Sequence, residues 1–434
     1  SRGFQSSVEP ILLFGLGENK LIDEIKITWF DGKQQLLKKI KADQLLTVKY
    51  REAAGKEEIK AEQNEHIFAD ITKQSNLDFM HMENEFDDFE REVLLPHKMS
   101  QFGPALAVAD VNNDGLEDFY IGGAKGSTGV LYYQNQDNTF SRDTGTLWEL
   151  DNSYEDVVAI FFDSDNDSDL DVYIVSGGGD FDENDAGLQD RLYINDGNGK
   201  FSKSENLIPA MHVSGSCVKP GDFDGDGDND LFIGGRYIPG KYPYAPRSYL
   251  LEIESGKYTD VTDQIAPALS KAGMVTDAEW VDFNGDNTLD LVVLGEWMPI
   301  MMMVNKGNVL RDIVASSGIV DQTGWWFSIT SEDVDNDGDI DFVAGNLGLN
   351  YKYKASTEYP FSVYADDFDN NGKPDIVLGY YNDGKQFPVR GRQCSSQQIP
   401  LIKEKYKTYN DFAQASLIDI YADLGLDKAL NYEV

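Results

Sequence analysis

The stretch DFDGDGDND at residues 222–230 is one of six copies of a nine-residue pattern, Asp-x-[Asp/Asn]-x-[Asp/Asn]-x-x-x-Asp. The other copies are DVNNDGLED (110–118), DSDNDSDLD (163–171), DFNGDNTLD (282–290), DVDNDGDID (333–341) and DFDNNGKPD (367–375). Oxygen side chains at positions 1, 3, 5 and 9 of a tight loop describe a cage for a hard cation. Calcium fits best because it accepts about six to eight oxygen ligands in flexible geometry, whereas magnesium prefers a stricter octahedron and keeps its waters. A single acidic turn could occur without binding any metal ion, but six copies with the same spacing predict metal binding.

Position 7 of each loop is expected to contribute its backbone carbonyl, since Leu116, Thr288 and Lys373 stand there in three copies. The expected cofactor is therefore Ca²⁺, about six ions with a structural role. The predicted metal ligands are Asp110, Asn112, Asp114, Leu116 and Asp118; Asp163, Asp165, Asp167, Asp169 and Asp171; Asp222, Asp224, Asp226, Asp228 and Asp230; Asp282, Asn284, Asp286, Thr288 and Asp290; Asp333, Asp335, Asp337, Asp339 and Asp341; and Asp367, Asp369, Asn371, Lys373 and Asp375.

The residues around each loop predict strands rather than helices. A helix-loop-helix calcium site needs a Glu at position 12. All six copies instead have an apolar residue there, and each loop precedes a short apolar run such as LFIGG (231–235). Short β-branched and aromatic runs bounded by Gly are typical of strands. The residues before a loop, such as 106–108, also look extended, so the repeating unit is strand, calcium loop, strand.

The spacing of the loops predicts a β-propeller over residues 101–434. Successive loops begin 51–60 residues apart, except for the 34 residues between Asp333 and Asp367. Periods near 50 with several strands each are typical of propeller blades. The predicted fold class is all-β, an integrin-α-like propeller of seven blades that is incomplete in this chain. The missing blade would come from beyond Val434 or from the 66–100 segment folding back. A helical insertion is expected at about 400–425, with Asn410 capping a helix over 411–422.

The N-terminal residues differ from the repeats. Within residues 1–50, Ile25, Ile27 and Trp29 alternate with polar residues as in a half-buried strand, and Asp31-Gly32 is a hairpin signal. The apolar stretches 35–40 and 45–50 would complete a small β unit, truncated at its start. Residues 51–100 are expected to form a polar linker, for which a helix over 51–65 is one alternative, and an extended wrap.

Two parts of the sequence resemble known families. The six cages with Gly-containing strand ends resemble FG-GAP (VCBS-type) repeats, the blades of integrin-α-like propellers. FGLG (14–17) and IDEIKITWFDGKQQLL (22–37) resemble an ASPIC/UnbV domain. Cartilage acidic protein and many bacterial surface proteins combine the two. The resemblance implies calcium at positions 1, 3, 5, 7 and 9 and no established catalysis. Here the ASPIC-like unit precedes the propeller, which suggests a tandem array and a fragment of a longer chain.

Composition limits the compartment and the partners. The chain has 434 residues and a net charge of −39, which six calcium ions would reduce to roughly −27. Nucleic acid and anionic membranes would be repelled. No run of 18 apolar residues predicts membrane insertion. Calcium is plentiful outside cells, so the expected location is extracellular or at a bacterial outer-membrane surface. Whether Cys217 and Cys394 pair is left open by the sequence.

The sequence lacks the common catalytic motifs HExxH, G-x-S-x-G and CxxC. GYYNDGK (379–385) is close to a phosphate loop, but Gln386 follows it, so a hairpin turn is expected. His81 lies among acids and is a weak metal candidate. The best binding candidates are aromatic residues, for which blade packing is the more ordinary interpretation, and arginines, which are expected to pair with internal acids. These candidates are Trp325, Trp326, Tyr351, Tyr353, Tyr380, Tyr381, Arg236, Arg390 and Arg392.

Three functions remain open from the sequence. The favoured one is a non-enzymatic, calcium-stabilised extracellular binding or scaffold module within a larger bacterial cell-surface assembly. The second is a glycan-binding component of an outer-membrane polysaccharide-uptake system. The third is a propeller-type polysaccharide lyase or hydrolase, which a funnel lined by Tyr, Arg and a carboxylate would favour. Protein partners at the surface are expected, and glycan is a possible ligand.

Overall fold

The computed structural model describes residues 12, 14–17, 19–29, 31–56, 68–319 and 322–434. These residues divide into two compact units, of which the first ends at Ile71 and the second is Thr72–Val434. The opening residues 1–11, His66 and most of the predicted linker (57–65) lie outside the described residues.

The first unit is a three-stranded antiparallel sheet of β1 (Leu21–Thr28), β2 (Lys33–Lys41) and β3 (Ala54–Lys56). The β1–β2 hairpin turns at Asp31-Gly32, where Gly32 has a φ of 84° and the Lys33 amide donates to Asp31 Oδ1 at 3.2 Å. Glycine adopts this left-handed conformation without steric penalty, which confirms the predicted hairpin. The expected third strand at 45–50 is wrong, because β3 begins only at Ala54.

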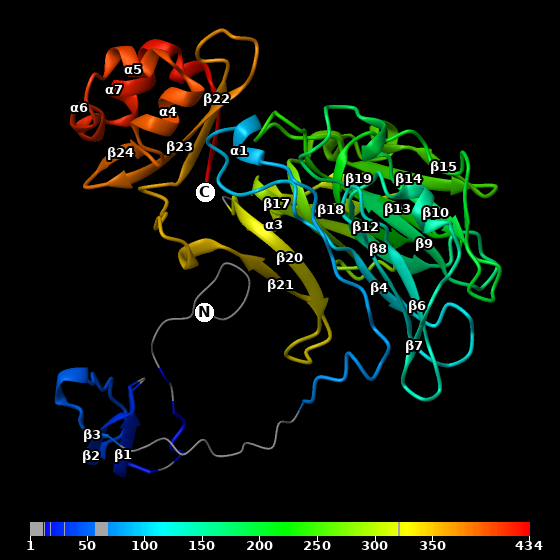
Figure 1. Cartoon of the computed structure of the whole chain (residues 1–434), viewed down its shortest axis with the longest axis horizontal. Helices are drawn as coiled ribbons and strands as arrows, with labels where there is room; N and C mark the ends of the chain where they lie inside the picture. Colours follow the sequence, from blue (N-terminus) through cyan, green and yellow to red (C-terminus); the bar gives the residue numbers. More distant parts are fainter. Residues whose placement is uncertain (1–11, 13, 18, 30, 57–67, 320–321) are drawn as a thin grey trace. The chain divides into compact units, whose positions relative to one another are not determined.

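The second unit consists of successive antiparallel sheets, coloured from cyan to red in Figure 1. Three sheets have four strands in chain order, and a six-stranded sheet and a final four-stranded sheet follow. The strands of the first three are β4 (Leu106–Ala109), β5 (Asp118–Ile121), β6 (Val130–Gln134) and β7 (Phe140–Arg142); β8 (Asp156–Phe162), β9 (Asp171–Ser176), β10 (Arg191–Ile194) and β11 (Ser202–Lys203); and β12 (Ser214–Gly221), β13 (Asp230–Tyr237), β14 (Tyr249–Glu254) and β15 (Lys257–Asp260).

The six-stranded sheet joins the fourth and fifth repeats. It contains β16 (Met274–Val281), β17 (Asp290–Met298), β18 (Met301–Asn305), β19 (Leu310–Asp312), β20 (Gly324–Glu332) and β21 (Asp341–Asn346). The fifth repeat supplies only β20 and β21, and β20 pairs with the end of β17 through Trp325 and Glu296. Thirty-four residues between loops are too few for four strands with their turns, which explains the reduced repeat.

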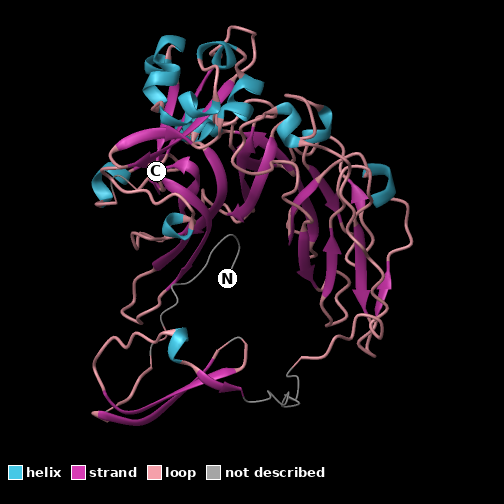
Figure 2. Cartoon of the chain, turned by 60° about the vertical axis from the view of Figure 1, so that its left-hand side comes forward, coloured by secondary structure: helices cyan, strands magenta, loops and turns pink. Residues whose placement is uncertain are grey.

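The first strands of successive sheets lie beside one another. β4 contacts β8, β8 contacts β12, β12 contacts β16, and β16 contacts β20. Figure 2 draws the strands as magenta arrows and the helices in cyan. The main apolar clusters lie between neighbouring sheets, as where Phe232 and Leu250 pack with Val275 and Leu291. Packing side by side buries faces that a single sheet would leave in water. The second unit thus has the predicted all-β, propeller-like fold.

The last sheet carries most of the helices. Its strands are β22 (Ser362–Asp366), β23 (Asp375–Asn382), β24 (Lys385–Pro388) and β25 (Leu430–Glu433), and β25 pairs with β22. The helices between β24 and β25 are α4 (Arg392–Gln398), α5 (Leu401–Lys405), α6 (Tyr409–Gln414) and α7 (Leu417–Tyr421). The other short helices are α1 (Asp88–Arg91), α2 (Thr262–Ile265), α3 (Val314–Ser317) and the 3-10 turns Tyr50–Glu52, Trp148–Asp151, Ala186–Leu188, Pro267–Lys271, Gly348–Asn350, Ala422–Leu424 and Leu426–Lys428.

The single helix expected over 411–422 is wrong in detail. Two helices replace it, because Ser416 caps α7 by accepting from the Asp419 amide while Asp419 accepts from the Ser416 amide. This capping box starts a new helix. Thr408, and not Asn410, caps α6 by accepting from the Asp411 amide at 3.1 Å.

Residues 72–104 cross the second unit as an extended segment with one short helix, α1. Its contacts include hydrogen bonds of side chains and of backbone: Asp78 Oδ1 accepts from Tyr132 Oη at 2.6 Å, and Met82 O accepts from Ser127 Oγ at 2.9 Å. Among the described residues this segment adds no strand, so it is not the source of a missing blade.

Candidate metal centres

Each of the six Asp loops connects the first two strands of its repeat. The Asp110 loop joins β4 to β5, the Asp222 loop joins β12 to β13, and the others occupy the same place in their repeats. The position-9 aspartate is the first residue of the second strand in every case. The predicted strand-loop-strand unit is therefore confirmed.

The aspartate at position 1 holds the loop backbone. Asp222 Oδ1 accepts from the Asp226 amide at 3.1 Å, and its Oδ2 accepts from the Gly227 amide at 3.1 Å. Position 1 accepts from the position-6 amide in all six loops, and the position-5 side chain accepts from the position-7 amide in all six. These bonds fold nine residues so that the acidic side chains face a common centre.

Positions 4 and 6 have left-handed backbones in every copy. In the Asp222 loop these are Gly225 and Gly227, with φ of 80° and 98°. Asn and Gly tolerate this region far better than other residues. The residues concerned are Asn113, Asn166, Gly225, Gly285, Asn336 and Asn370 at position 4, and Gly115, Ser168, Gly227, Asn287, Gly338 and Gly372 at position 6. The sequence interpretation missed these positions, although their restricted composition was visible.

The position-9 aspartate joins its loop to the third strand. Asp230 Oδ2 accepts from the Phe223 amide in the loop at 3.3 Å, and its Oδ1 accepts from the Ile253 amide in β14 at 3.0 Å. The same link to the third strand is made by Asp118 to Gln134, Asp171 to Asn195 and Asp290 to Asn305. This aspartate therefore has a structural role beyond any metal.

Four loops bring three carboxylates together. In the Asp222, Asp333 and Asp367 loops, oxygen atoms of positions 1, 3 and 9 lie within 4.8 Å of one another; in the Asp163 loop, positions 1, 3 and 5 do so. Elsewhere in the described chain, the Asp110 and Asp282 loops do not gather three acids so closely, since Asn112 and Asn284 stand at position 3. Carboxylate groups of this kind are suited to a hard cation.

Burial and mutual repulsion perturb these carboxyls. Burial raises the pKa of Asp230 to about 7 and, with the nearby charge of Asp369, the pKa of Asp375 to about 7. Burial, reinforced by Asp114 and Asp110, raises the pKa of Asp118 to about 6. A divalent cation would supply the positive charge that keeps such groups ionised. The acid chemistry of the loops therefore fits a metal ion.

Side chains of one sheet also reach the loop of the sheet before it. Asn195 Nδ2 donates to Val111 O at 2.8 Å, and Asn305 Nδ2 donates to Phe223 O at 2.6 Å. Tyr258 Oη is 3.4 Å from Ser164 O in the equivalent contact. All three carbonyls belong to position 2, so the Asp110, Asp163 and Asp222 loops are each braced from the next sheet.

The arginine and histidine candidates have internal partners. Arg236 pairs with the buried Glu296, Arg390 donates to Leu95 O and Arg392 to Tyr406 O. His81 Nε2 lies 2.9 Å from Glu83 Oε1. The aromatic candidates are packing residues: Trp325 is buried, Trp326 and Tyr381 are partly buried, and the residues that pack against the cluster of Trp325 are Tyr351, Tyr353 and Tyr380. Cys217 and Cys394 are free thiols. Asp383-Gly384 forms the turn of the β23–β24 hairpin, as expected.

No curated protein matches the sequence. Among solved structures, that of an Agrocybe aegerita lectin recognising non-reducing terminal N-acetylglucosamine is 17% identical, covers 64% of this chain and 65% of its own, and has a TM-score of 0.36. Saccharomyces cerevisiae Sqt1 is 11% identical, with 68% and 62% covered and a TM-score of 0.32. The chain thus spans less than two thirds of either protein.

Two families match the sequence itself. The family described as ASPIC and UnbV matches residues 1–55. The FG-GAP-like repeat matches residues 163–233 and 282–344, which include four of the Asp loops and, nearly complete, the strand pairs β12–β13 and β20–β21. The chain therefore contains FG-GAP-like repeats, in agreement with the repeated loop geometry, and an ASPIC and UnbV region.

Proposed function

We propose that this protein is a non-enzymatic, calcium-stabilised extracellular module that binds or organises partners within a larger bacterial cell-surface assembly. The observation that carries the proposal is the convergence of carboxylates in loops that all stand between the first and second strands. The repeats and these acidic groups support a binding or scaffold module in general. Calcium, its structural role and the surface assembly are the specific parts of the proposal.

Calcium is the ion that suits these loops. They offer carboxylates, amides and backbone carbonyls on a turn whose backbone is fixed by its own hydrogen bonds. Such a cage provides the many oxygen ligands and irregular geometry that calcium accepts and magnesium does not. Weak calcium sites are typical of extracellular modules, and FG-GAP-like repeats are typical of extracellular or surface proteins. In the described part of the chain, no helix is long and apolar enough to cross a membrane.

The burial of one cluster of polar side chains in the second unit favours a binding role over catalysis. Arg236, Tyr242 and Glu296 bring an arginine, a tyrosine and a carboxylate together. Tyr242 and Glu296 are, however, fully buried, and the Tyr242 hydroxyl donates a hydrogen bond to the Glu296 carboxylate. Groups that satisfy each other away from solvent are typical of structural networks. The lyase or hydrolase alternative would need the Tyr242 hydroxyl and the Glu296 carboxylate to face a substrate.

The metal proposal is tested by two alanine variants of one loop. Asp335 stands at position 3 and is expected to bind through its carboxylate, while Asp339 stands at position 7 and is expected to bind through its carbonyl. Equilibrium dialysis with ⁴⁵Ca²⁺ should give about six ions for the native chain and for Asp339→Ala, and about five for Asp335→Ala. Equal loss in both variants, or no loss in either, contradicts the proposed ligand set.

The non-enzymatic part is tested separately. The calcium-loaded chain is incubated with neutral and acidic polysaccharides, and new reducing ends and unsaturated products are measured over time. The proposal expects retention of a partner without turnover. Product formation that saturates with substrate and survives repurification contradicts it.

A further inference from the structure

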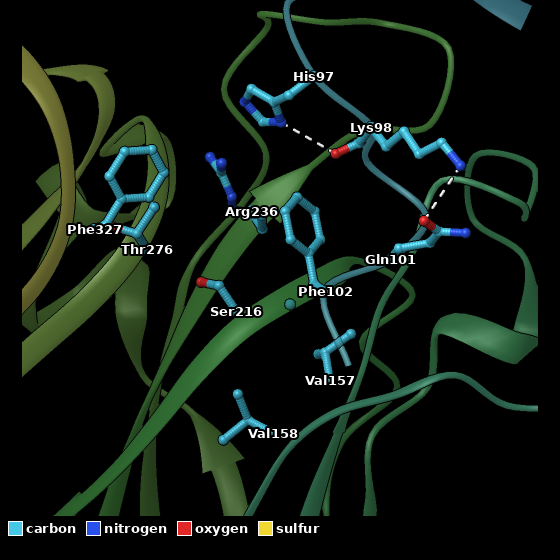
Figure 3. A pocket seen from close by; sticks show the side chains of 11 residues that line it. His97, Lys98, Gln101, Phe102, Val157, Val158, Ser216, Arg236, Thr276 and Phe327 are labelled. Carbon is cyan, nitrogen blue, oxygen red and sulfur yellow. Dashed lines mark hydrogen bonds between the residues drawn. The ribbon is translucent and has the colours of Figure 1, made fainter. Parts of the chain in front are cut away.

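A cavity of about 330 Å³ opens where the first strands of four successive repeats meet in the second unit (Figure 3). Its wall comes from the first strands β8, β12, β16 and β20, from Arg236 at the end of β13, and from residues 97–102 of the extended segment. Small-molecule sites commonly have volumes of about 300–1,000 Å³ and form where several elements meet. None of the six Asp loops contributes a lining residue.

The charge of this cavity is opposite to that of the chain. The chain has 76 acidic and 37 basic side chains, yet the lining includes His97, Lys98 and Arg236 and no carboxylate. A cavity lined by one sign of charge concentrates ligands of the opposite sign. This reversal distinguishes the cavity from the surrounding acidic surface.

Hydrogen bonding fixes His97 as a cation. Its Nδ1 is 3.0 Å from Lys98 O, and its Nε2 is 3.0 Å from Glu296 Oε2. Both partners accept only, so both ring nitrogens must donate and the imidazole is protonated. Burial opposes this charge, but Glu296 outweighs burial and raises the pKa of His97.

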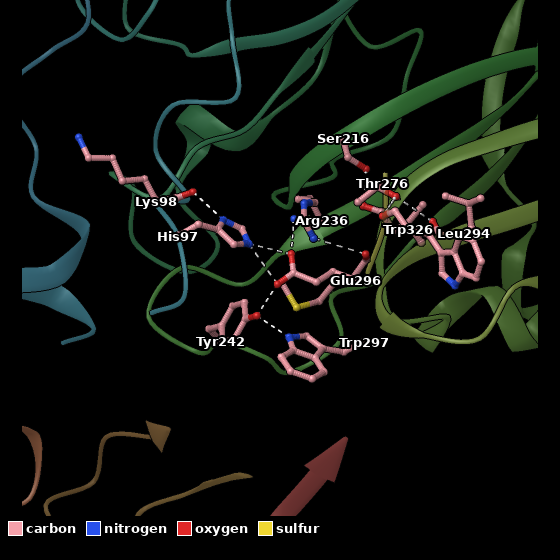
Figure 4. Close-up of polar contacts among 12 residues, drawn as sticks. His97, Lys98, Ser216, Arg236, Tyr242, Thr276, Leu294, Glu296, Trp297 and Trp326 are labelled. Atoms are coloured by element: carbon pink, nitrogen blue, oxygen red, sulfur yellow. Dashed lines mark hydrogen bonds and ion pairs between the residues drawn. The ribbon is translucent and has the colours of Figure 1, made fainter. Parts of the chain in front are cut away.

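One carboxylate therefore faces two buried cations. Glu296 lies behind the cavity and accepts from His97, Arg236 and Tyr242 (Figure 4). Arg236 is only 3% exposed, and its guanidinium carbon lies 5.2 Å from the centre of the Phe102 ring. Its remaining described contact is a long one, 3.5 Å to Met274 O. Because an uncompensated buried charge is unfavourable, the extra cation favours an anion in the cavity.

The polar neutral groups indicate what else the ligand carries. Ser216 Oγ lies 2.7 Å from Val275 O, and Thr276 Oγ1 lies 2.9 Å from Trp326 O. A hydroxyl that donates to a carbonyl keeps lone pairs free to accept, so both groups can receive hydrogen bonds from ligand hydroxyls. Phe102, Phe327 and Val157 supply apolar surface beside them.

We propose that this cavity binds a small polyhydroxylated carboxylate of the size of a hexuronic acid. The carboxylate lies toward Arg236 and His97, with Lys98 at the mouth. Ligand hydroxyls donate to Ser216 and Thr276, and the apolar face of the ring packs on Phe102. The inference rests on the proposed binding role and deepens it by naming a ligand class.

The test uses the full chain with calcium at physiological ionic strength, with D-glucuronate, D-glucose and acetate as probes. Isothermal titration and ligand-observed NMR should show glucuronate binding at least about tenfold more tightly than glucose or acetate. Glucose lacks the carboxylate, and acetate lacks the hydroxyl groups and the ring. Glucose binding equal to glucuronate overturns the anion role, and acetate binding equal to glucuronate overturns the hydroxyl role. No binding of glucuronate overturns the whole inference.

Two variants connect binding to the cavity. Lys98→Gln, which keeps a polar group near Gln101, should weaken glucuronate about threefold, and His97→Gln about tenfold. Lys200→Gln changes an exposed lysine outside the cavity and should leave affinity unchanged. Equal affinity in all three variants places the ligand elsewhere and contradicts the proposal. The calcium-dependent shift in melting temperature, recorded on the same samples, separates failure of this inference from failure of the calcium proposal.

Discussion

The aspartate at position 9 of the loops has two duties at the scale of the residue. Asp230 is buried, faces Asp222 and Asp224, and accepts hydrogen bonds from two backbone amides. Asp224 faces the same centre, and its Oδ1 accepts from the Asp226 amide inside the loop. Removing Asp230 therefore takes away a metal ligand and also disconnects the loop from β14.

We expect Asp230→Ala and Asp224→Ala to differ once calcium is removed. With calcium, both should lower the free energy of unfolding, because each loses a ligand. In excess chelator, Asp230→Ala should remain destabilised by about 1–3 kcal/mol because buried amides lose their acceptor, whereas Asp224→Ala should be close to native because it relieves repulsion. Urea denaturation with and without chelator measures this. Equal effects under both conditions would show that Asp230 acts only as a ligand.

The His97–Glu296 pair predicts a pH dependence of stability. The pKa of His97 is raised in the folded state above its unfolded value of about 6.5. Its charge therefore stabilises the fold fully at pH below about 6.5, and this contribution is lost as the pH rises through the folded pKa. The other charged groups facing His97 are Arg236 and Lys98.

The expected result is a pH-dependent difference between the native chain and His97→Gln in free energy of unfolding. The difference should be largest near pH 5–6 and shrink toward pH 9, since glutamine can donate to Glu296 but carries no charge. Urea denaturation at a series of pH values measures it, with His212→Gln as a control histidine outside the network. A difference that stays constant or grows with pH contradicts the assigned pair.

Single residues also show how far the sequence could be interpreted. The oxygen spacing at positions 1, 3, 5 and 9 was recognisable because ligand chemistry restricts residue type. Asn195 and Asn305 were not, since nothing in their local sequence indicates that each faces a carbonyl more than 80 positions earlier. Such contacts depend on how neighbouring sheets stack.

The bracing of one sheet by the next is the main feature at the scale of the element. Asn305, the last residue of β18, donates to Phe223 O in the preceding loop and to Leu289 O at 3.2 Å in its own. Both contacts are inside the unit, and Asn305 is 2% exposed. The Asp222 loop is therefore not independent of the neighbouring sheet.

We expect Asn305→Ala to weaken the Asp222 loop, although Asn305 is not a predicted ligand. Two carbonyls lose their donor, which costs about 1–3 kcal/mol of stability. Calcium affinity at the Asp222 loop should fall along with it. The matched control is Asn308→Gly, at the tip of the following turn where the φ of 61° favours glycine. Calorimetric titration with calcium measures the affinity of both variants. Equal calcium affinities in the two would show that Asn305 does not influence the Asp222 loop.

The elements themselves were predictable to different degrees. The strand after the Asp163 loop follows from an apolar run that is buried on both faces, Val172–Val175, whereas β21 after the Asp333 loop is only partly buried. The division of the C-terminal helix also had a local signal, since Ser416 and Asp419 have the capping-box spacing. The reduced fifth repeat was indicated only by its short interval, and its pairing with β17 has no signal in the sequence.

At the scale of the whole molecule, the charge distribution links the fold to its solvent. A chain of net charge −39 concentrates carboxylates in six loops beside buried strands. Without cations these groups repel one another and are partly protonated near neutral pH, as the raised pKa of Asp230 and Asp375 indicates. The cavity lined by Arg236 could not be predicted from the sequence, because its lining residues are far apart in the chain, from His97 to Phe327.

The most direct test of the account is the thermal unfolding of the full chain as a function of calcium. Each site at ten times its dissociation constant adds about 1.4 kcal/mol, so several sites together should raise the melting temperature by well over about 5 °C relative to chelator. Magnesium at the same concentration should give a much smaller shift. Verified metal-free protein with a melting curve identical to that of the calcium-saturated protein would contradict the central claim that the loops are structural calcium sites.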